Sequence, residues 1–213
     1  MVDSAKTPGR SYRGATADER RDERKRKLIE AGIKVIGRDG YASTTVRAVC
    51  AEAGLTERYF YEAIGDREQL LGEVYGHLVT QLRAQIAETV MTAGDLNAAA
   101  LARLGLTGYF AAMRDNPDAA RILLFEVLGV SPEVTRLSQR AIADFAMLIR
   151  MTARRLPQLP VPEQQEDLIT AGLVGSVVFI AMTWFLEGYQ RDLDDVVGSA
   201  MTIFNAVVDT VDH

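Results

Sequence analysis

The amino-acid sequence predicts an all-α protein of about nine helices. Apolar residues recur at three- and four-residue steps through most of the 213-residue chain, as at Leu28, Ile29, Ile33 and Ile36. Glycine, asparagine and proline interrupt this pattern where helices would begin or end. No segment has the strict apolar and polar alternation that predicts a half-buried strand.

The first helix is expected from about Asp18 until Gly37 and Gly40 end it. Gly40 suits a C-terminal cap, because glycine adopts left-handed backbone angles without strain. Hydroxyl side chains then offer acceptors that can cap a new helix start. Two short helices follow, at residues 45–53 and 56–64, with a tight glycine turn between them.

The remaining helices are expected to be longer. Gly65-Asp66 forms a break and a cap, from which a fourth helix runs past Val90. Asn116-Pro117 is a natural start for the sixth helix, because proline suits the first helical turn. The fifth to ninth helices are expected at residues 97–114, 116–128, 131–156, 163–189 and 192–211.

Charge is unevenly distributed along the chain. The formal net charge of -5 argues by itself against a nucleic-acid partner, yet residues 1–71 carry 14 Lys and Arg against 12 Asp and Glu. A locally basic surface can bind phosphate on an acidic protein, because salt screens distant charge. The cluster from Arg20 to Lys27 either contacts DNA or, since acidic residues interleave with it, forms an ordinary charged helix face.

Several features predict a cytoplasmic protein without a membrane partner. Cys50 is the only cysteine, so no internal disulfide can form, and it falls on an apolar stripe that suits a core residue better than a redox switch. The N-terminal segment has no apolar stretch like that of a signal peptide. The apolar run from Leu173 to Leu186 is shorter than the roughly 20 residues that cross a bilayer, which predicts a buried core helix.

The residues offer little chemistry for catalysis. His77 and His213 are the only histidines, and no Cys and His spacing fits a metal site. Neither a phosphate loop nor a dinucleotide fingerprint occurs, and acidic residues sit at polar helix positions. We therefore expect no enzyme activity, catalytic residue, metal or cofactor.

The segment from Thr45 to Ile64 holds the two short helices and their turn, which are the ingredients of a helix-turn-helix. Gly54 can take the left-handed conformation of the turn, and Leu55 can fill the space between the helices. Thr56 can cap the third helix, whose N-terminal end would then face a DNA phosphate or base edge. Many all-α folds contain such a turn, so the spacing alone is a weak signal.

Residues 25–72 resemble the tetracycline-repressor-like (TetR) family of one-component regulators. The matching motifs are Ile29-Glu30-Ala31 through Gly40-Tyr41, Thr44-Thr45-Val46, Ala53-Gly54-Leu55-Thr56, Phe60-Tyr61 and Arg67-Glu68-Gln69-Leu70-Leu71. Three positions depart from the usual pattern: Arg58 stands for a common glycine, Glu62-Ala63 for an aromatic or His pair, and Arg67 for a Lys. These departures leave the fold intact and the base preference open.

The resemblance implies a helix-turn-helix DNA-binding domain at residues 18–71 and a ligand-binding and dimerisation domain at 72–213, after a flexible arm at 1–17. A homodimer would join through the last two helices and place a third helix in the major groove of each half of a pseudo-palindromic operator. A small hydrophobic effector would release this repressor. The expected DNA contacts are Thr45, Arg47, Thr56, Glu57, Arg58, Tyr59, Tyr61 and Arg67.

Aromatic and methionine side chains of the middle helices are candidates for the effector pocket, since methionine adapts to hydrophobic ligands. They are Tyr109, Phe110, Met113, Phe125, Met147, Met151, Phe179 and Met182. The same side chains also suit an ordinary core. Gly172 and Gly175 would allow close approach of a second protomer, or a close contact within the chain. An alternative function is a helical ligand-binding protein with a non-functional DNA-binding head, which salt-dependent DNA binding would exclude.

Overall fold

The computed structural model describes residues 17–94, 96–153 and 163–209; these residues form nine α-helices and no strand, which confirms the predicted all-α class. In chain order the elements are α1 (Ala17–Asp39), α2 (Val46–Ala53), α3 (Glu57–Ala63), α4 (Arg67–Thr92), α5 (Ala98–Asp115), α6 (Pro117–Arg121), the π-helix η1 (Ile122–Glu126), α7 (Pro132–Ala153), α8 (Glu163–Leu186) and α9 (Leu193–Asp209). Residues 1–16 of the expected arm lie outside the described residues.

Short-range hydrogen bonds begin the helices. The hydroxyl of Thr45 accepts a hydrogen bond from the backbone N–H three residues later at 3.1 Å and caps α2. Asp66, Asn97 and Asn116 cap α4, α5 and α6 in the same way. Gly40 follows α1 with φ 81°, the left-handed conformation expected of a C-terminal cap.

Gly37 was expected to end α1, and this prediction is wrong, because α1 continues through Gly37 to Asp39. A Cβ atom at Gly37 would lie 2.5 Å from the Cβ of Asp118 and 2.9 Å from its Cα. The missing side chain therefore lets α6 pack directly on α1. Only the tertiary contact reveals this reason for the glycine.

The expected sixth helix is divided in two. Its α-helical part, α6, ends at Arg121, and the next five residues form the π-helix η1. Ile122 and Leu124 are buried while Leu123 and Phe125 are half-buried, so four consecutive apolar side chains turn inward. An apolar run of this kind predicts burial, but its periodicity does not distinguish a π-helix from an α-helix.

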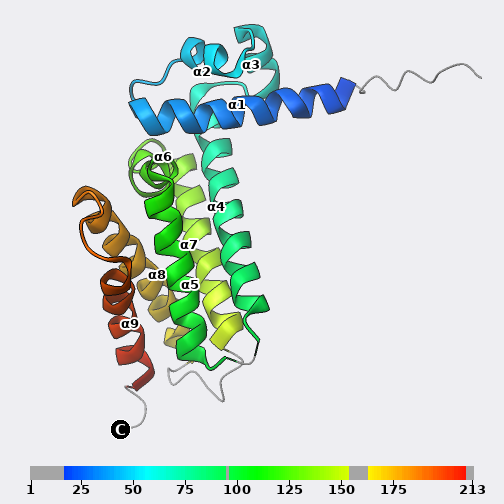
Figure 1. The fold of residues 1–213 in the computed structure, drawn as a ribbon. Helices are drawn as coiled ribbons and strands as arrows, with labels where there is room; N and C mark the ends of the chain where they lie inside the picture. Colours follow the sequence, from blue (N-terminus) through cyan, green and yellow to red (C-terminus); the bar gives the residue numbers. More distant parts are fainter. Residues whose placement is uncertain (1–16, 95, 154–162, 210–213) are drawn as a thin grey trace, which may run out of the picture.

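The helices form a small head on a longer body (Figure 1). The head consists of α1, which lies across the top, and of α2 and α3 above it. α4 runs from the head down into the body, where α5 and α7 stand beside it and α8 and α9 flank them (Figure 1). Position 71, the expected end of the DNA-binding region, lies within α4, so the head and the body share one continuous helix.

Two clusters of buried side chains hold this arrangement together. The first combines head residues such as Leu28 and Phe60 with Val74 of α4 and Ile122 of η1. The second lies in the body, where Phe110 and Trp184 belong to it. Because the first cluster includes α4 and η1, the orientation of the head depends on where these two elements lie.

Helix α8 has two different faces. Its stretch Gln165–Leu186 is long and apolar enough to cross a membrane by length and composition alone, and 33% of its most apolar window is buried in the protein. Val177 and Trp184 pack in the body cluster, so the predicted burial holds for one face of the helix, while the expectation that the apolar run is too short to span a bilayer is wrong. Leu168 and Phe179 are instead 78% and 70% exposed, so the other face lacks a partner within the described residues.

Candidate nucleic-acid interface and internal cavity

The predicted turn between α2 and α3 has the geometry of a helix-turn-helix. Gly54 ends α2 with φ 65°, and the backbone N–H of Leu55 donates to the carbonyl of Cys50 at 2.9 Å. Leu55 packs on the head cluster, and Cys50 is buried as expected. Burial raises the pKa of the Cys50 thiol, with a smaller contribution from Glu57, so the thiol stays protonated.

Helix α3 is anchored mainly by one side chain and leaves most of the others in solvent. Phe60 is completely buried in the head cluster. The exposed residues of this helix and of its N-terminal cap are Thr56, Glu57, Arg58, Tyr59, Tyr61 and Glu62. The predicted contact residues Thr45 and Arg47 at the start of α2 are exposed as well. A surface of this shape can enter a DNA groove without disturbing the core.

Thr56 occupies the N-cap position of α3, as expected, but its side chain makes no capping hydrogen bond. The first turn of α3 is closed instead by the Thr56 carbonyl, which accepts from the backbone N–H of Tyr59 at 3.0 Å. The prediction of a side-chain cap at Thr56 is therefore wrong. The exposed hydroxyl is left for an outside partner.

Arg58 lies flat along α3 in the structure. Its Nε donates to Glu62 Oε1 at 2.8 Å, and the side chain is 84% exposed. This hydrogen bond, together with the charge of Glu62, raises the pKa of Arg58. Exposed pairs at this spacing are weak, so a guanine edge can compete with Glu62 for the guanidinium.

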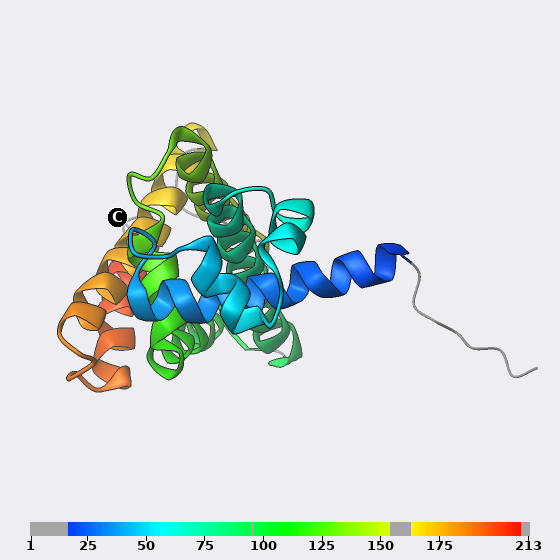
Figure 2. The same cartoon turned by 90° about the horizontal axis from the view of Figure 1, so that it is seen from above.

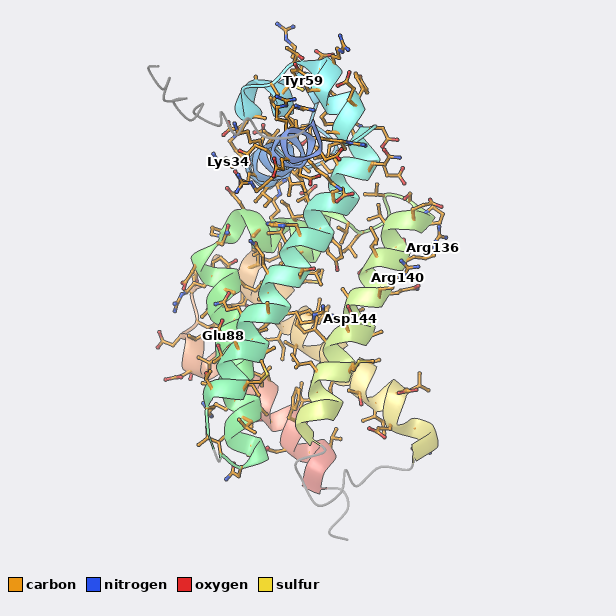
Figure 3. All side chains as sticks on the ribbon, turned by 90° about the vertical axis from the view of Figure 1, so that its right-hand side faces the viewer. Lys34, Tyr59, Glu88, Arg136, Arg140 and Asp144 are labelled. Carbon is orange, nitrogen blue, oxygen red and sulfur yellow. The ribbon has the colours of Figure 1, made fainter. Side chains whose placement is uncertain are left out.

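The two exposed tyrosines of α3 differ in their surroundings. The guanidinium carbon of Arg24 in α1 lies 4.8 Å from the centre of the Tyr59 ring, within the range of a cation–π contact. Figure 3 shows Tyr59 in the head, above α1. The Tyr61 ring packs edge-on against Phe60 with its centre 5.6 Å away, yet Tyr61 is 56% exposed. Tyr61 can therefore keep its packing while its hydroxyl contacts a phosphate.

Arg67, another predicted DNA contact, is half-buried and already bonded within the protein. It donates a hydrogen bond to the carbonyl of Thr44, and its guanidinium carbon lies 5.3 Å from the centre of the Tyr41 ring. These contacts tie the loop before α2 to the start of α4. The DNA contact expected of Arg67 stays a prediction, and its structural role was not foreseen from the sequence.

The body contains a cavity of about 210 Å³ between α4, α5, η1, α7, α8 and α9. Its wall includes Leu82, Gly105, Phe145, Val177 and Phe204, and none of the residues that form it is charged. Among them, only the hydroxyls of Tyr75 and Tyr109 are polar side-chain groups. The cavity can therefore accept an apolar molecule with few hydrogen-bonding groups.

Both tyrosines stay neutral in this environment. Burial is the main cause that raises the pKa of Tyr109, with smaller contributions from Tyr75 and Tyr189. Burial also raises the pKa of Tyr75, against the opposing effect of Ser138. The two hydroxyls therefore remain hydrogen-bond donors and carry no charge that would attract a cationic ligand.

The cavity wall differs from the pocket expected from the sequence. Tyr109 lines it, as do Gly105 and many aliphatic side chains that were not among the candidates. Six of the other candidates do not line the cavity: Phe110, Met113, Phe125, Met147, Phe179 and Met182. The side chain of the remaining candidate, Met151, lies outside the described part of the structure. Composition marked these residues as apolar, but did not reveal which side of each helix turns toward the cavity.

Their actual positions explain the difference. Phe110 and Met113 are buried in the body cluster, where Phe110 packs against Trp184 with ring centres 6.1 Å apart. Phe125 packs against Phe185 with ring centres 5.2 Å apart. Met147 and Phe179 are the opposite case, because they are 54% and 70% exposed on the surface. Met182 is half-buried beside the body cluster.

A set of polar contacts joins η1 to the head. Arg121 Nε donates to Glu126 Oε1 at 2.8 Å, and Glu126 Oε2 accepts from the backbone N–H of Tyr41 at 2.7 Å. Arg121 also donates to the carbonyls of Gly37 and Arg38 at the end of α1, at 3.4 and 3.3 Å. We call these contacts the α1–η1 clasp. The contacts with Tyr41, Gly37 and Arg38 connect residues more than 80 positions apart, and they were not foreseen from the sequence.

The clasp lies next to the cavity along the chain. Leu123 and Leu124, which line the cavity, stand between Arg121 and Glu126. A shift of η1 on the cavity side would therefore also move the groups that hold the end of α1. In the part of the chain that the structure describes, no group of three or more His, Cys, Asp or Glu side chains is placed to hold a metal ion.

Comparison with known proteins agrees with this geometry. Residues 28–74 match the model of the bacterial regulatory proteins, tetR family. The fatty acid degradation regulator FadR from Bacillus halodurans is 13% identical, with a TM-score of 0.71 over 87% of this chain and 94% of that one. FadR from Bacillus subtilis, solved in complex with stearoyl-CoA, is 15% identical, with a TM-score of 0.71 over 86% and 97%. A TetR-family regulator from Mesorhizobium loti is 16% identical, with a TM-score of 0.69 over 90% and 98%.

The matched segment begins in α1 and ends in α4, and so contains the whole helix-turn-helix. The structural similarity extends over the body as well, and the described residues share one helical architecture with these regulators. Residues 28–74 therefore form a helix-turn-helix region of the bacterial regulatory proteins, tetR family, and the described chain as a whole shares its fold with the solved regulators.

Proposed function

We propose that the protein is a cytoplasmic, dimeric repressor that leaves a pseudo-palindromic operator when an apolar effector enters its cavity. The observation that carries the proposal is the location of the cavity. Its wall includes α4 and η1, and both elements also contribute to the cluster that holds the head. A molecule that displaces either element would change the orientation of the helix-turn-helix.

On the DNA side, the proposal assigns operator contact to the exposed side chains of α2 and α3. Arg58 and Tyr59 would face base edges, while Arg47, Thr56 and Tyr61 would contact the phosphate backbone. Glu57 and Thr45 lie on the same exposed surface. Because Thr44 and Tyr41 hold the guanidinium of Arg67, this residue would position the loop before α2. It would contact a phosphate only without leaving these two partners.

A second copy of the chain would cover the unpartnered face of α8. Leu168, Gly172, Gly175, Phe179 and Leu186 recur at three-, four- and seven-residue steps, so they share one side of the helix. The three large side chains are exposed, and a Cβ atom at either glycine would meet nothing. A self-complementary pairing of α8 and α9 would bury this face and place two heads on one operator.

The effector would be an apolar molecule whose charged groups, if it has any, stay outside the cavity. The uncharged wall makes burial of a charge costly, whereas a hydrocarbon chain gains from leaving water. The relative from Bacillus subtilis was solved with stearoyl-CoA, which combines a long hydrocarbon chain with a charged carrier. We therefore propose a fatty acyl chain, free or carried by coenzyme A, as the first effector class to test.

The experiment has two stages. Selection from a randomised DNA pool should enrich a palindromic sequence that binds more tightly than random DNA. Fluorescence anisotropy with this operator should then show release by acyl-CoA, with a dependence on chain length, and no release by free coenzyme A at the same concentration. Enrichment without release by any acyl chain would contradict the effector class. Acyl-CoA binding without any enriched DNA would favour the alternative, a ligand-binding protein with a non-functional head.

A further inference from the structure

The N-terminal part of α1 extends beyond the rest of the protein. It leaves the head beside α3 and projects past the other helices (Figures 1 and 2). No core requires a helix at this place, and the sequence there is highly charged.

The charges of this extension are sorted by side. At about 100° per residue, five basic residues fall within roughly 160° of the helix circumference, and four acidic residues fall within roughly 140° on the opposite side. The basic face of α1 consists of Arg20, Arg21, Arg24, Lys25 and Lys27. The acidic face consists of Asp18, Glu19, Asp22 and Glu23, with Arg26 among them. The interleaving that looks neutral in the sequence is thus a separation of charge in space.

Two contacts show where the basic face points. Arg24 lies over the ring of Tyr59 in α3, and Lys25 Nζ lies 2.8 Å from Glu73 Oε1 in α4. Arg20, one turn before Arg24, therefore follows the α3 side of the helix. Leu28 is the first buried residue among the described side chains of α1, and the basic residues precede it on the same side of the helix. The basic face therefore lies toward the recognition helix α3.

Of the other three residues of this face, Lys27 Nζ lies 3.8 Å from Glu23 Oε1, while Arg20 and Arg21 are available for a partner. Arg20 and Arg21 are exposed and form no ion pair with any described residue. Arg24 is different, because its Nε is buried without a hydrogen-bond partner while its guanidinium covers Tyr59. Arg24 thus fixes the extension to α3, and Arg20 and Arg21 stand free beside it.

We infer that the basic face of α1 is a second DNA-contacting surface, which binds phosphates next to the segment that α3 reads. Duplex DNA fits this surface because its phosphates form a continuous line of negative charge that leads from α3 to the neighbouring extension. The inference rests on the proposed placement of α3 in the major groove. It adds a set of contacts that depend on salt and on the length of the DNA, but not on the base sequence.

The test compares single variants that remove one charge each from the same helix. Arg20→Gln and Arg21→Gln alter the basic face, and Arg26→Gln on the acidic face is the matched control. The affinity of each full-length protein for the selected operator is measured against salt concentration. Each basic-face variant should reduce the slope of log affinity against log salt by roughly 0.9 per lost phosphate contact, and Arg26→Gln should leave it unchanged.

A second measurement locates the contact. The operator is trimmed from both ends until only the base pairs within reach of α3 remain. On this short DNA the basic-face variants should bind as tightly as the unaltered protein. Equal slopes for Arg20→Gln, Arg21→Gln and Arg26→Gln on long DNA would overturn the inference, as would a difference that persists on the short DNA. Failure of the unaltered protein to bind any selected DNA would instead overturn the proposed function.

Discussion

The α1–η1 clasp leads to a prediction about how the effector signal reaches the head. Glu126 accepts hydrogen bonds from Arg121 and from the backbone of Tyr41, and its side chain is only 14% exposed. Replacement by Ala leaves the Tyr41 N–H without its partner and breaks the ion pair. Replacement by Gln keeps an acceptor but removes the charge.

The expected loss of stability can be worked out from these contacts. A hydrogen bond to a charged group contributes about 1.5–3 kcal/mol, and the ion pair adds little because Arg121 is 38% exposed. We expect Glu126→Ala to lose about 3 kcal/mol and Glu126→Gln about 1 kcal/mol of unfolding free energy. At about 2–4 °C per kcal/mol for a chain of this size, Glu126→Gln should lower the Tm by about 2–4 °C and remain folded.

The functional effect separates coupling from stability. Glu126→Gln should bind operator and acyl-CoA with affinities close to those of the unaltered protein, but release should require more acyl-CoA, because η1 no longer holds the end of α1 as firmly. Anisotropy measures release, and isothermal titration calorimetry measures acyl-CoA binding separately.

The control is Asp144→Asn, which breaks the 2.8 Å ion pair with Arg83 between α4 and α7. Asp144 lies along α7 in the body, away from the head (Figure 3). This variant should change release no more than it changes acyl-CoA binding. Equal release curves for Glu126→Gln and the unaltered protein, at equal acyl-CoA affinity, would refute the role of the clasp.

Three other predictions concern the cavity, the recognition helix and the dimer. Gly105→Leu should fill part of the cavity and abolish acyl-CoA binding while operator binding persists. A Cβ at Gly105 would lie 3.7 Å from its nearest neighbours, which is an ordinary contact, and the larger side chain extends into free space. Unchanged acyl-CoA affinity in calorimetry would place the ligand elsewhere. Arg58→Ala should weaken specific operator binding by roughly 10- to 100-fold and relax the preference at one base pair, as measured by repeating the DNA selection. The companion variant Glu62→Gln frees Arg58 from its ion pair and should not weaken operator binding. Phe179→Asp should convert the dimer to monomers in sedimentation experiments, since it places a charge on the exposed apolar face of α8; a dimer that survives the substitution would contradict the proposed interface.

Several helix starts and the helix-turn-helix could be predicted because short-range interactions decide them. The caps at Thr45, Asp66 and Asn97 bond to backbone groups three residues away, so the local sequence contains everything that they need. The left-handed turn at Gly54 is local in the same sense. The exposure of α3 follows from the spacing around Phe60, its one fully buried anchor.

The ligand cavity could not be predicted residue by residue. Helix α8 is apolar over most of its length, so composition does not reveal that Val177 faces the cavity while Phe179 faces solvent. The same ambiguity placed Phe110 and Met113 of α5 among the pocket candidates, although they pack in the core. Which face is which depends on where neighbouring helices lie.

By itself, the sequence determined the helical class, the turn of the DNA-binding motif and the basic composition of the first helix, because each depends on residues within a few positions of one another. Only the tertiary structure decided that Gly37 admits α6, that Glu126 bonds to the backbone of Tyr41, and that the basic face of α1 lies toward α3. Those contacts join segments far apart in the chain. Their geometry arises only when the buried faces of several helices pack together, and no local pattern encodes it.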